Sequence, residues 1–155
     1  MTKPTLALQN ASKAKSIPSK KLFKTWANTA VGTHKKKYEI VIRIVDTKEI
    51  TQLNKRYRKK NQPTNIISFK FYPPANIQSN LLGDLIICAP IVKLEAKLQH
   101  KTTISHWAHM TIHGVLHLLG YDHQNKKEAQ KMEKLEIKIL KELGFEDPYN
   151  KEYFL

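Results

Sequence analysis

The segment from residue 105 to residue 119 is apolar on almost every side when it is wound as a helix. Bulky apolar side chains occur all around its axis, at Trp107, Met110, Ile112, Val115, Leu116, Leu118 and Leu119. A helix with so little polar surface must be covered by other elements, so we predict that it lies buried at the centre of the molecule. Gly120 is well placed to cap its C-terminus.

Before and after this segment, the chain alternates predicted strands with predicted helices. Apolar alternation and β-branched residues favour strands at Thr5–Gln9, Tyr38–Val45, Thr64–Tyr72 and Gly83–Cys88. Helical spacing favours further helices at Ser19–Val31 and from about Pro90 to about Gln99. A capping box formed by Asp46 and Glu49 would begin another helix, which runs to about Arg58. A last helix ends at Gly144. The 155 residues contain neither a repeat nor a linker. We therefore predict a single domain over residues 1–155, of the α+β or α/β class, with helices backing a small sheet.

Positive charge is concentrated in two parts of the chain. Lys and Arg number 27 against 13 acidic residues, which gives a formal net charge of +14. Residues 1–37 carry nine Lys and no acid, and residues 50–83 carry six basic residues and no acid. Such a concentration favours a polyanionic partner such as nucleic acid, although a solvated Lys-rich face would have the same composition.

Several classes of protein are excluded by simple counts. A single cysteine, Cys88, rules out a disulfide framework within the chain and a cysteine-based zinc cluster, and we expect it to be a buried apolar residue. The first residues lack the apolar region of a signal peptide, and no apolar run approaches the length that spans a membrane. We predict a cytoplasmic protein without a membrane partner.

Four histidines lie along one side of the central helix, at His106, His109, His113 and His117. Two imidazoles four residues apart on a helix lie side by side and can share a metal ion. Two such pairs overlap at His113, and the third ligand decides between them. His123 follows the Gly120 cap, where the returning chain passes closer to His117 than to His109. We therefore predict His113, His117 and His123 as the metal ligands, and His106 and His109 as core or pocket-lining residues.

The spacing of these histidines and of Gly120 is that of the metzincin metallopeptidases, H-E-x-x-H-x-x-G-x-x-H. In this chain Gly114 stands where the peptidases have the glutamate that acts as general base. Three neutral ligands would hold a divalent ion with an open position. The sequence thus supplies the metal site of a hydrolase and lacks the base of a peptidase, so a peptidase is the less favoured alternative.

The eleven residues from His113 to His123, HGVLHLLGYDH, resemble the signature of the YbeY family of bacterial ribosomal RNA maturation factors. Further blocks are similar to the same family: Leu53-Asn54 with Tyr57-Arg58, then Pro63 to Phe69, Leu82 to Ile87, and the spacing of Met132 and Glu136. The resemblance covers roughly residues 50–148. It implies an α+β domain in which a mixed four-stranded sheet packs with about five helices and the buried helix carries the metal histidines.

The resemblance also implies a function. Members of the family are zinc-dependent endoribonucleases that act on single-stranded RNA in ribosomal RNA maturation, at the 3′ end of the small-subunit RNA, and in ribosome quality control. For this chain it implies one Zn²⁺ held by the three histidines and a functionally important arginine at Arg58. The expected partners are ribosomal RNA, the ribosome and small-subunit ribosomal proteins, and not DNA. The basic residues around Arg58 are predicted to bind RNA, namely Lys55, Arg56, Lys59 and Lys60.

Three questions stay open at this point. A ribosome assembly factor with a mainly structural metal would carry the same motifs as the nuclease. Asp122 could either orient the imidazole of His123 or form a turn. The rings of Tyr57, Phe69, Phe71 and Tyr72 offer surfaces on which bases stack, but aromatic residues of strands are usually core, so we leave them out of the predicted site.

Overall fold

In the part of the chain that the structure describes, a mixed sheet of four strands forms the middle of the molecule. The computed structural model describes residues 5–35 and 37–149. The strands occur in the order β1-β2-β4-β3, with β1, β2 and β4 parallel and β3 antiparallel to β4. Their bounds are Thr5–Asn10 for β1, Glu39–Val45 for β2, Ile66–Lys70 for β3 and Leu81–Cys88 for β4. The expected mixed four-stranded sheet is confirmed, and β3 is an edge strand.

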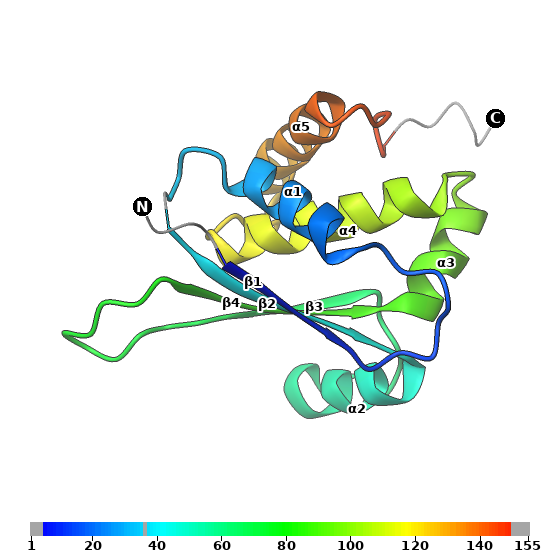
Figure 1. Ribbon diagram of the computed structural model, residues 1–155, viewed down its shortest axis with the longest axis horizontal. Helices are drawn as coiled ribbons and strands as arrows, with labels where there is room; N and C mark the ends of the chain where they lie inside the picture. Colours follow the sequence, from blue (N-terminus) through cyan, green and yellow to red (C-terminus); the bar gives the residue numbers. More distant parts are fainter. Residues whose placement is uncertain (1–4, 36, 150–155) are drawn as a thin grey trace.

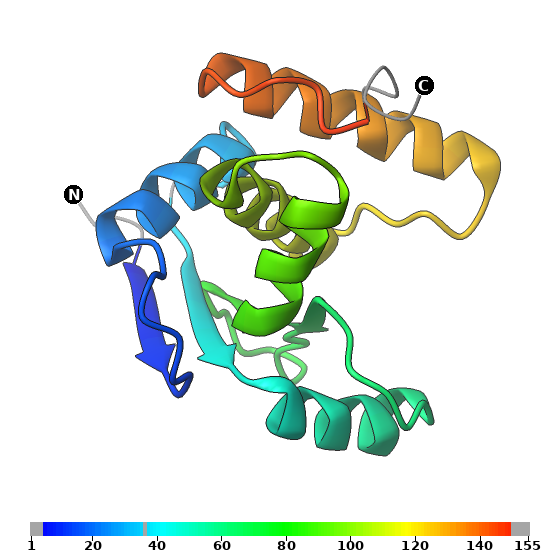
Figure 2. The same cartoon turned by 90° about the vertical axis from the view of Figure 1, so that its right-hand side faces the viewer.

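Within the described residues, five helices surround this sheet, in agreement with the predicted number. One face carries α1 (Lys20–Val31) and α4 (Thr103–Leu118), with α3 (Ala89–Leu98) at the end of the sheet (Figure 1). The opposite face carries α2 (Thr47–Arg58). Figure 2 shows α5 (Lys126–Glu142) as an outer layer beyond α1 and α4. Helix α4 thus lies between the sheet and α5, at the centre of the α+β domain.

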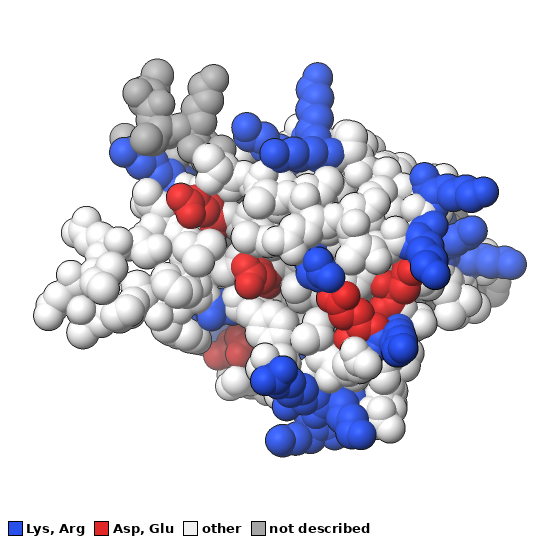
Figure 3. Space-filling model, turned by 60° about the horizontal axis from the view of Figure 1, so that its bottom comes forward, with Lys and Arg blue, Asp and Glu red and all other residues white. Residues whose placement is uncertain are grey.

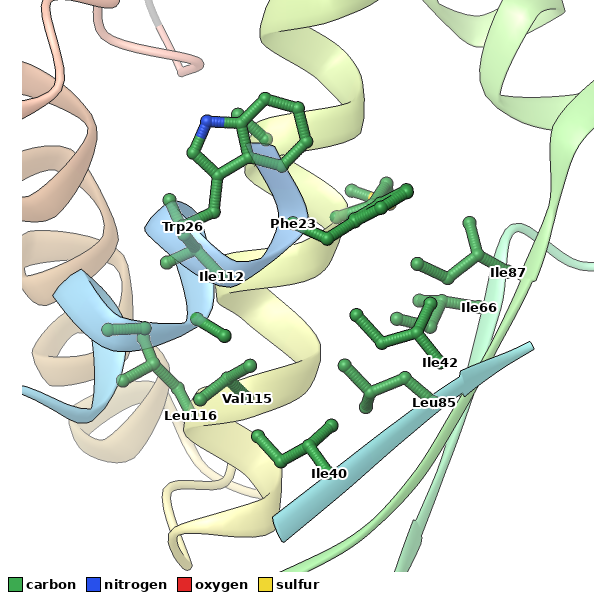
Figure 4. Packing of buried hydrophobic residues seen from close by; sticks show 14 of the residues in the cluster. Phe23, Trp26, Ile40, Ile42, Ile66, Leu85, Ile87, Ile112, Val115 and Leu116 are labelled. Atoms are coloured by element: carbon green, nitrogen blue, oxygen red, sulfur yellow. The ribbon is translucent and has the colours of Figure 1, made fainter. Parts of the chain in front are cut away.

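The main core fills the space between α1, α4 and the sheet (Figure 4). Alternate residues of β2 and β4, such as Ile42 and Leu85, point toward α4, whose Ile112, Val115 and Leu116 belong to the same core. In α4 only the first residues are exposed, and 11 of its residues are buried, which confirms the prediction of a central buried helix. A smaller cluster under α2 contains Cys88, which is buried as expected.

Two local predictions were wrong. The capping box at the start of α2 does not form, because the carboxylate of Asp46 accepts hydrogen bonds from the Ser12 hydroxyl (2.5 Å) and the Lys13 backbone N–H (3.0 Å). Glu49 instead pairs with Arg43 on the neighbouring strand, at 2.7 and 2.9 Å. The third strand is also shorter than predicted, because pairing with β4 ends near the Pro73-Pro74 turn. Among the described residues, no helix has the length and apolar character needed to cross a membrane.

Candidate metal centre

The turn after α4 brings a third histidine to the two on the helix. Gly120 has φ of 105°, a conformation that glycine adopts with little strain. Its N–H donates to the carbonyl of His117 and the N–H of Tyr121 donates to that of Leu116, both at 3.0 Å. This pair of bonds is the Schellman motif, which ends the helix and turns the chain back. The predicted cap at Gly120 is therefore what carries His123 toward α4.

The three imidazoles converge on one point. One ring nitrogen each of His113, His117 and His123 can be chosen so that all lie within 4.8 Å of one another. The Nε2 atoms of His113 and His117 are 3.1 Å apart, and the ring centroid of His123 lies 5.8 and 5.0 Å from theirs. A tetrahedral zinc ion with bonds of about 2.0–2.1 Å holds its ligand atoms roughly 3.4 Å apart. The observed group could therefore hold a metal ion after small ring movements.

Burial and charge keep one of these rings in the form that a metal needs. Burial and the nearby rings of His113 and His123 lower the pKa of His117 to about 4. Its imidazole is therefore neutral at neutral pH and keeps a lone pair for a ligand bond. The side chain of His123 is 56% exposed, so the group opens toward solvent on that side.

A buried carboxylate lies beneath the histidines. His113 donates from Nδ1 to Glu136 at 2.5 Å, His109 donates from Nε2 to the other carboxylate oxygen at 3.1 Å, and the Tyr149 hydroxyl also donates to it. Burial opposes the charge on Glu136, but the bonds from His109 and His113 outweigh it and lower its pKa to about 2. Because the proton of His113 is thereby kept on Nδ1, its Nε2 carries the lone pair that a metal would bind.

His109, His113 and Glu136 form a second group with metal-ligand spacing. His109 and Glu136 are buried, and the carboxylate already accepts three hydrogen bonds. We therefore infer that His109 and Glu136 orient His113, and that the metal site is the more exposed group of His113, His117 and His123. His109 is a buried residue that supports the group through Glu136. His106 is also buried, and its Nε2 forms a hydrogen bond with Glu95 at 2.9 Å.

The role of Glu136 was missed by the sequence analysis. Its signal is a carboxylate on the buried side of α5, four residues after Met132 and three before Ile139. A charged group on the buried side of a helix requires a hydrogen-bond partner. The histidines of α4 that were not predicted as metal ligands were available as donors.

The three histidines open into a cavity of about 580 Å³ at the edge of the sheet. One side of the cavity is formed by β3 residues Ile66, Ser68 and Lys70, and the end of α4 with its following turn forms another. Arg58, at the end of α2, also lines it. The structure thus brings the predicted Arg58 to the same cavity as the predicted metal ligands.

The other predicted RNA-binding residues lie outside this cavity. Lys55, Arg56, Lys59 and Lys60 are exposed, on the last turns of α2 and just after it. In Figure 3, Lys and Arg side chains gather over the bottom of the molecule, where α2 lies. These cations form a basic surface beside the cavity rather than part of its lining.

Two further residues near the histidines have structural roles. Asp122 accepts a hydrogen bond from the backbone N–H of His123 at 2.7 Å, whereas its carboxylate is 3.9 Å from the imidazole. Of the two alternatives for Asp122, the turn is therefore the one observed. Gly114 faces the sheet and not the cavity, since a Cβ there would lie 2.7 Å from Ile66 and 2.8 Å from Leu85.

An open three-histidine group in a cavity with an arginine and a lysine is a candidate metal site for a phosphate-bearing substrate. The model of the family described as Endoribonuclease YbeY matches residues 7–144. The chain therefore belongs to the YbeY family of endoribonucleases, which act in ribosomal RNA processing. The resemblance seen in the sequence motifs is confirmed.

The fold is also found in a solved structure. The solution structure of TM1509 from Thermotoga maritima matches with a TM-score of 0.57 and 23% sequence identity, covering 88% of this chain and 91% of that one. At this identity the match supports the fold.

Glu136→Gln is expected to weaken metal binding about 10- to 100-fold, the usual effect of removing a carboxylate that orients a histidine ligand. The amide keeps the size of the side chain but replaces one acceptor with a donor that faces imidazole N–H groups. Competition with a chelator of known affinity measures the change. Glu142→Gln, at an exposed position of the same helix, is the control. Equal metal affinity of the two variants would refute the role of Glu136.

Proposed function

We propose that this protein is a zinc-dependent endoribonuclease that cleaves single-stranded RNA. It would act in maturation of the small-subunit ribosomal RNA 3′ end and in ribosome quality control. The observation that supports this most is the convergence of the His113, His117 and His123 nitrogens on a cavity that Arg58 also lines. The family supplies the reaction class. The proposed partners are ribosomal RNA, the ribosome and small-subunit ribosomal proteins.

The three histidines would hold one zinc ion through ring nitrogens. A zinc ion held in this way would act as a Lewis acid on a phosphoryl oxygen. Glu136 keeps the Nδ1 proton of His113 in place, which directs the lone pair of Nε2 to the cavity. Three imidazoles, one of them hydrogen-bonded to a buried carboxylate, form a donor set that is typical of zinc sites.

Arg58 has the chemistry required at the scissile phosphate. A guanidinium donates two parallel hydrogen bonds to phosphate oxygens, and these strengthen as negative charge develops on them. The neighbouring Lys55, Arg56, Lys59 and Lys60 lie outside the cavity and would bind more distant phosphates. These residues would contribute to RNA affinity and to the association rate. They would not raise the cleavage rate, because contacts with distant phosphates are equally strong in the ground state and in the transition state.

The two alternatives are less well supported. A purely structural metal would be enclosed by its ligands, whereas the side chain of His123 is half exposed and the group opens to the cavity. A peptidase would need a general base at position 114, where the side chain would point into the sheet.

The purified protein is expected to contain about one zinc per chain and to cleave single-stranded RNA only with the metal present. Metal analysis, together with cleavage of a labelled RNA before and after chelation, tests this directly. His123→Ala should lose both zinc and cleavage, because only two helix histidines remain as ligands. His100→Asn is the matched control, since His100 is exposed, lies outside the cavity and has φ of 55°, which asparagine tolerates. Stoichiometric zinc in His123→Ala would contradict the assigned ligand set.

A further inference from the structure

Two residues that the sequence motifs do not single out lie in the same cavity as the histidines. Lys70 is the last residue of β3, and Tyr72 follows it by two positions. Both line the cavity. The expectation that Tyr72 is a core residue was wrong, because the strand ends before it and 76% of the residue is exposed. Phe69 is partly buried against the cluster under α2, and it packs at a centroid distance of 5.1 Å against Tyr57, which is exposed.

The position of Lys70 relative to the histidines follows from how α4 lies along β3. Near the middle of the helix, Gly114 packs against Ile66, the first residue of the strand. One helical turn later, Leu118 packs against Gly83, which pairs with Lys70. Past the helix end, the Lys70 ammonium lies 3.6 Å from the point where a Cβ of Gly120 would be. Lys70 therefore lies over the turn that joins His117 to His123.

Lys70 and Tyr72 form a pair with complementary chemistry. The Lys70 ammonium is 5.6 Å from the centroid of the Tyr72 ring, which is a cation–π distance. An exposed ring beside a cation is a platform on which a nucleobase can stack while its phosphate is neutralised. Residues 71–83 contain no charged side chain, and Figure 3 shows the projecting hairpin as an uncharged part of the surface. Lys70 is thus the last cation before this hairpin.

The hollow of the surface continues past this pair. A second cavity, of about 310 Å³, shares Lys70, Tyr72 and Leu118 with the metal cavity and extends to Lys35. A strand bound at the histidines would therefore meet Tyr72 and Lys70 next, where a recess with a further cation continues the path.

We propose that Lys70 and Tyr72 form a nucleotide subsite next to the metal centre. The base beside the scissile phosphate stacks on Tyr72, and Lys70 binds the phosphate of that nucleotide. The subsite rests on the proposed function, since it positions an RNA strand that is cleaved at the histidines. Its ligand is a single-stranded nucleotide, because a paired base would not have its face free to stack.

The test measures RNA affinity and cleavage separately in the metal-loaded protein. The probe is a fluorescent single-stranded RNA whose cleavage position has been mapped. Tyr72→Ala should weaken its binding about 5- to 100-fold, as loss of one stacking ring typically does, whereas Tyr72→Phe should bind like wild type. Lys70→Ala should lower the slope of log affinity against log salt concentration by about 0.7, the value for one phosphate on a single strand. Ile77→Ala is the control, being exposed on the same hairpin and outside both cavities.

An abasic RNA separates stacking from a structural effect. One nucleotide, immediately 5′ or 3′ of the scissile phosphate, is replaced by an abasic residue. At one of the two positions the difference between wild type and Tyr72→Ala should disappear. The subsite is refuted if Tyr72→Ala binds intact RNA as tightly as wild type, or if its defect persists with both abasic RNAs. Tyr72-dependent binding without cleavage would support the subsite and refute the nuclease proposal, so the two failures are distinguishable.

Discussion

Arg58→Ala is expected to reduce the rate of RNA cleavage about 100- to 1,000-fold at saturating RNA, with zinc content and fold unchanged. Loss of one donor to an oxyanion typically has an effect of this size. Arg58→Glu should abolish cleavage, because it places a negative charge where negative charge develops. The exposed position of Arg58 on the cavity wall means that neither change disturbs the core. Single-turnover cleavage at saturating RNA measures the effect.

Arg58→Lys is the most informative variant of the series. Lysine keeps the charge but loses the planar fork, so an intermediate or full loss of rate indicates bidentate binding of phosphate. Lys60→Ala is the control for charge alone and should lower only affinity and its salt dependence, by about 0.7 in slope. Lys60 is preferable to Lys59, whose φ of 61° adds a backbone effect. Wild-type rates for both Arg58→Ala and Arg58→Lys would show that Arg58 belongs only to the basic surface.

Gly114→Glu is expected to destabilise the protein by about 3–5 kcal/mol or to prevent folding. Its Cβ alone would lie within 2.8 Å of Ile66 and Leu85, and its carboxylate would be buried among apolar side chains without a partner. The sequence comparison with peptidases predicts weakened cleavage without peptidase activity. The structure supplies the cause, which is the packing of α4 on the sheet.

Chemical denaturation of Gly114→Glu measures this effect. Ile104→Glu is the control, because it adds the same side chain to the exposed first turn of the same helix, where a carboxylate is favourable. A Gly114→Glu protein as stable as wild type would contradict the packing argument. Hydrolysis of casein by that protein would additionally revive the peptidase alternative.

Local patterns in the sequence were sufficient for much of the fold. The near-complete apolar surface of residues 105–119 predicted a buried central helix, and alternation in residues 38–45 predicted a strand that is now β2. The capping box at Asp46 failed because the atoms that bind Asp46 and Glu49 come from other segments, Ser12 and Arg43. Spacing along one helix cannot reveal such competitors.

Some residues of the candidate site are brought together by local sequence, and others only by the tertiary structure. His113 and His117 are four apart on one helix, and Gly120 turns the chain so that His123 follows within a few residues, so their convergence is encoded locally. Arg58, Glu136 and Lys70 belong to three other elements, and only the strand order and the stacking of α5 on α4 bring them to the histidines. Position 114 faces the sheet because that side of α4 packs against β3 and β4, which is again a contact between distant elements. Sequence spacing determines what a single helix and its adjoining turn can present, whereas contacts between distant elements depend on how the whole core packs.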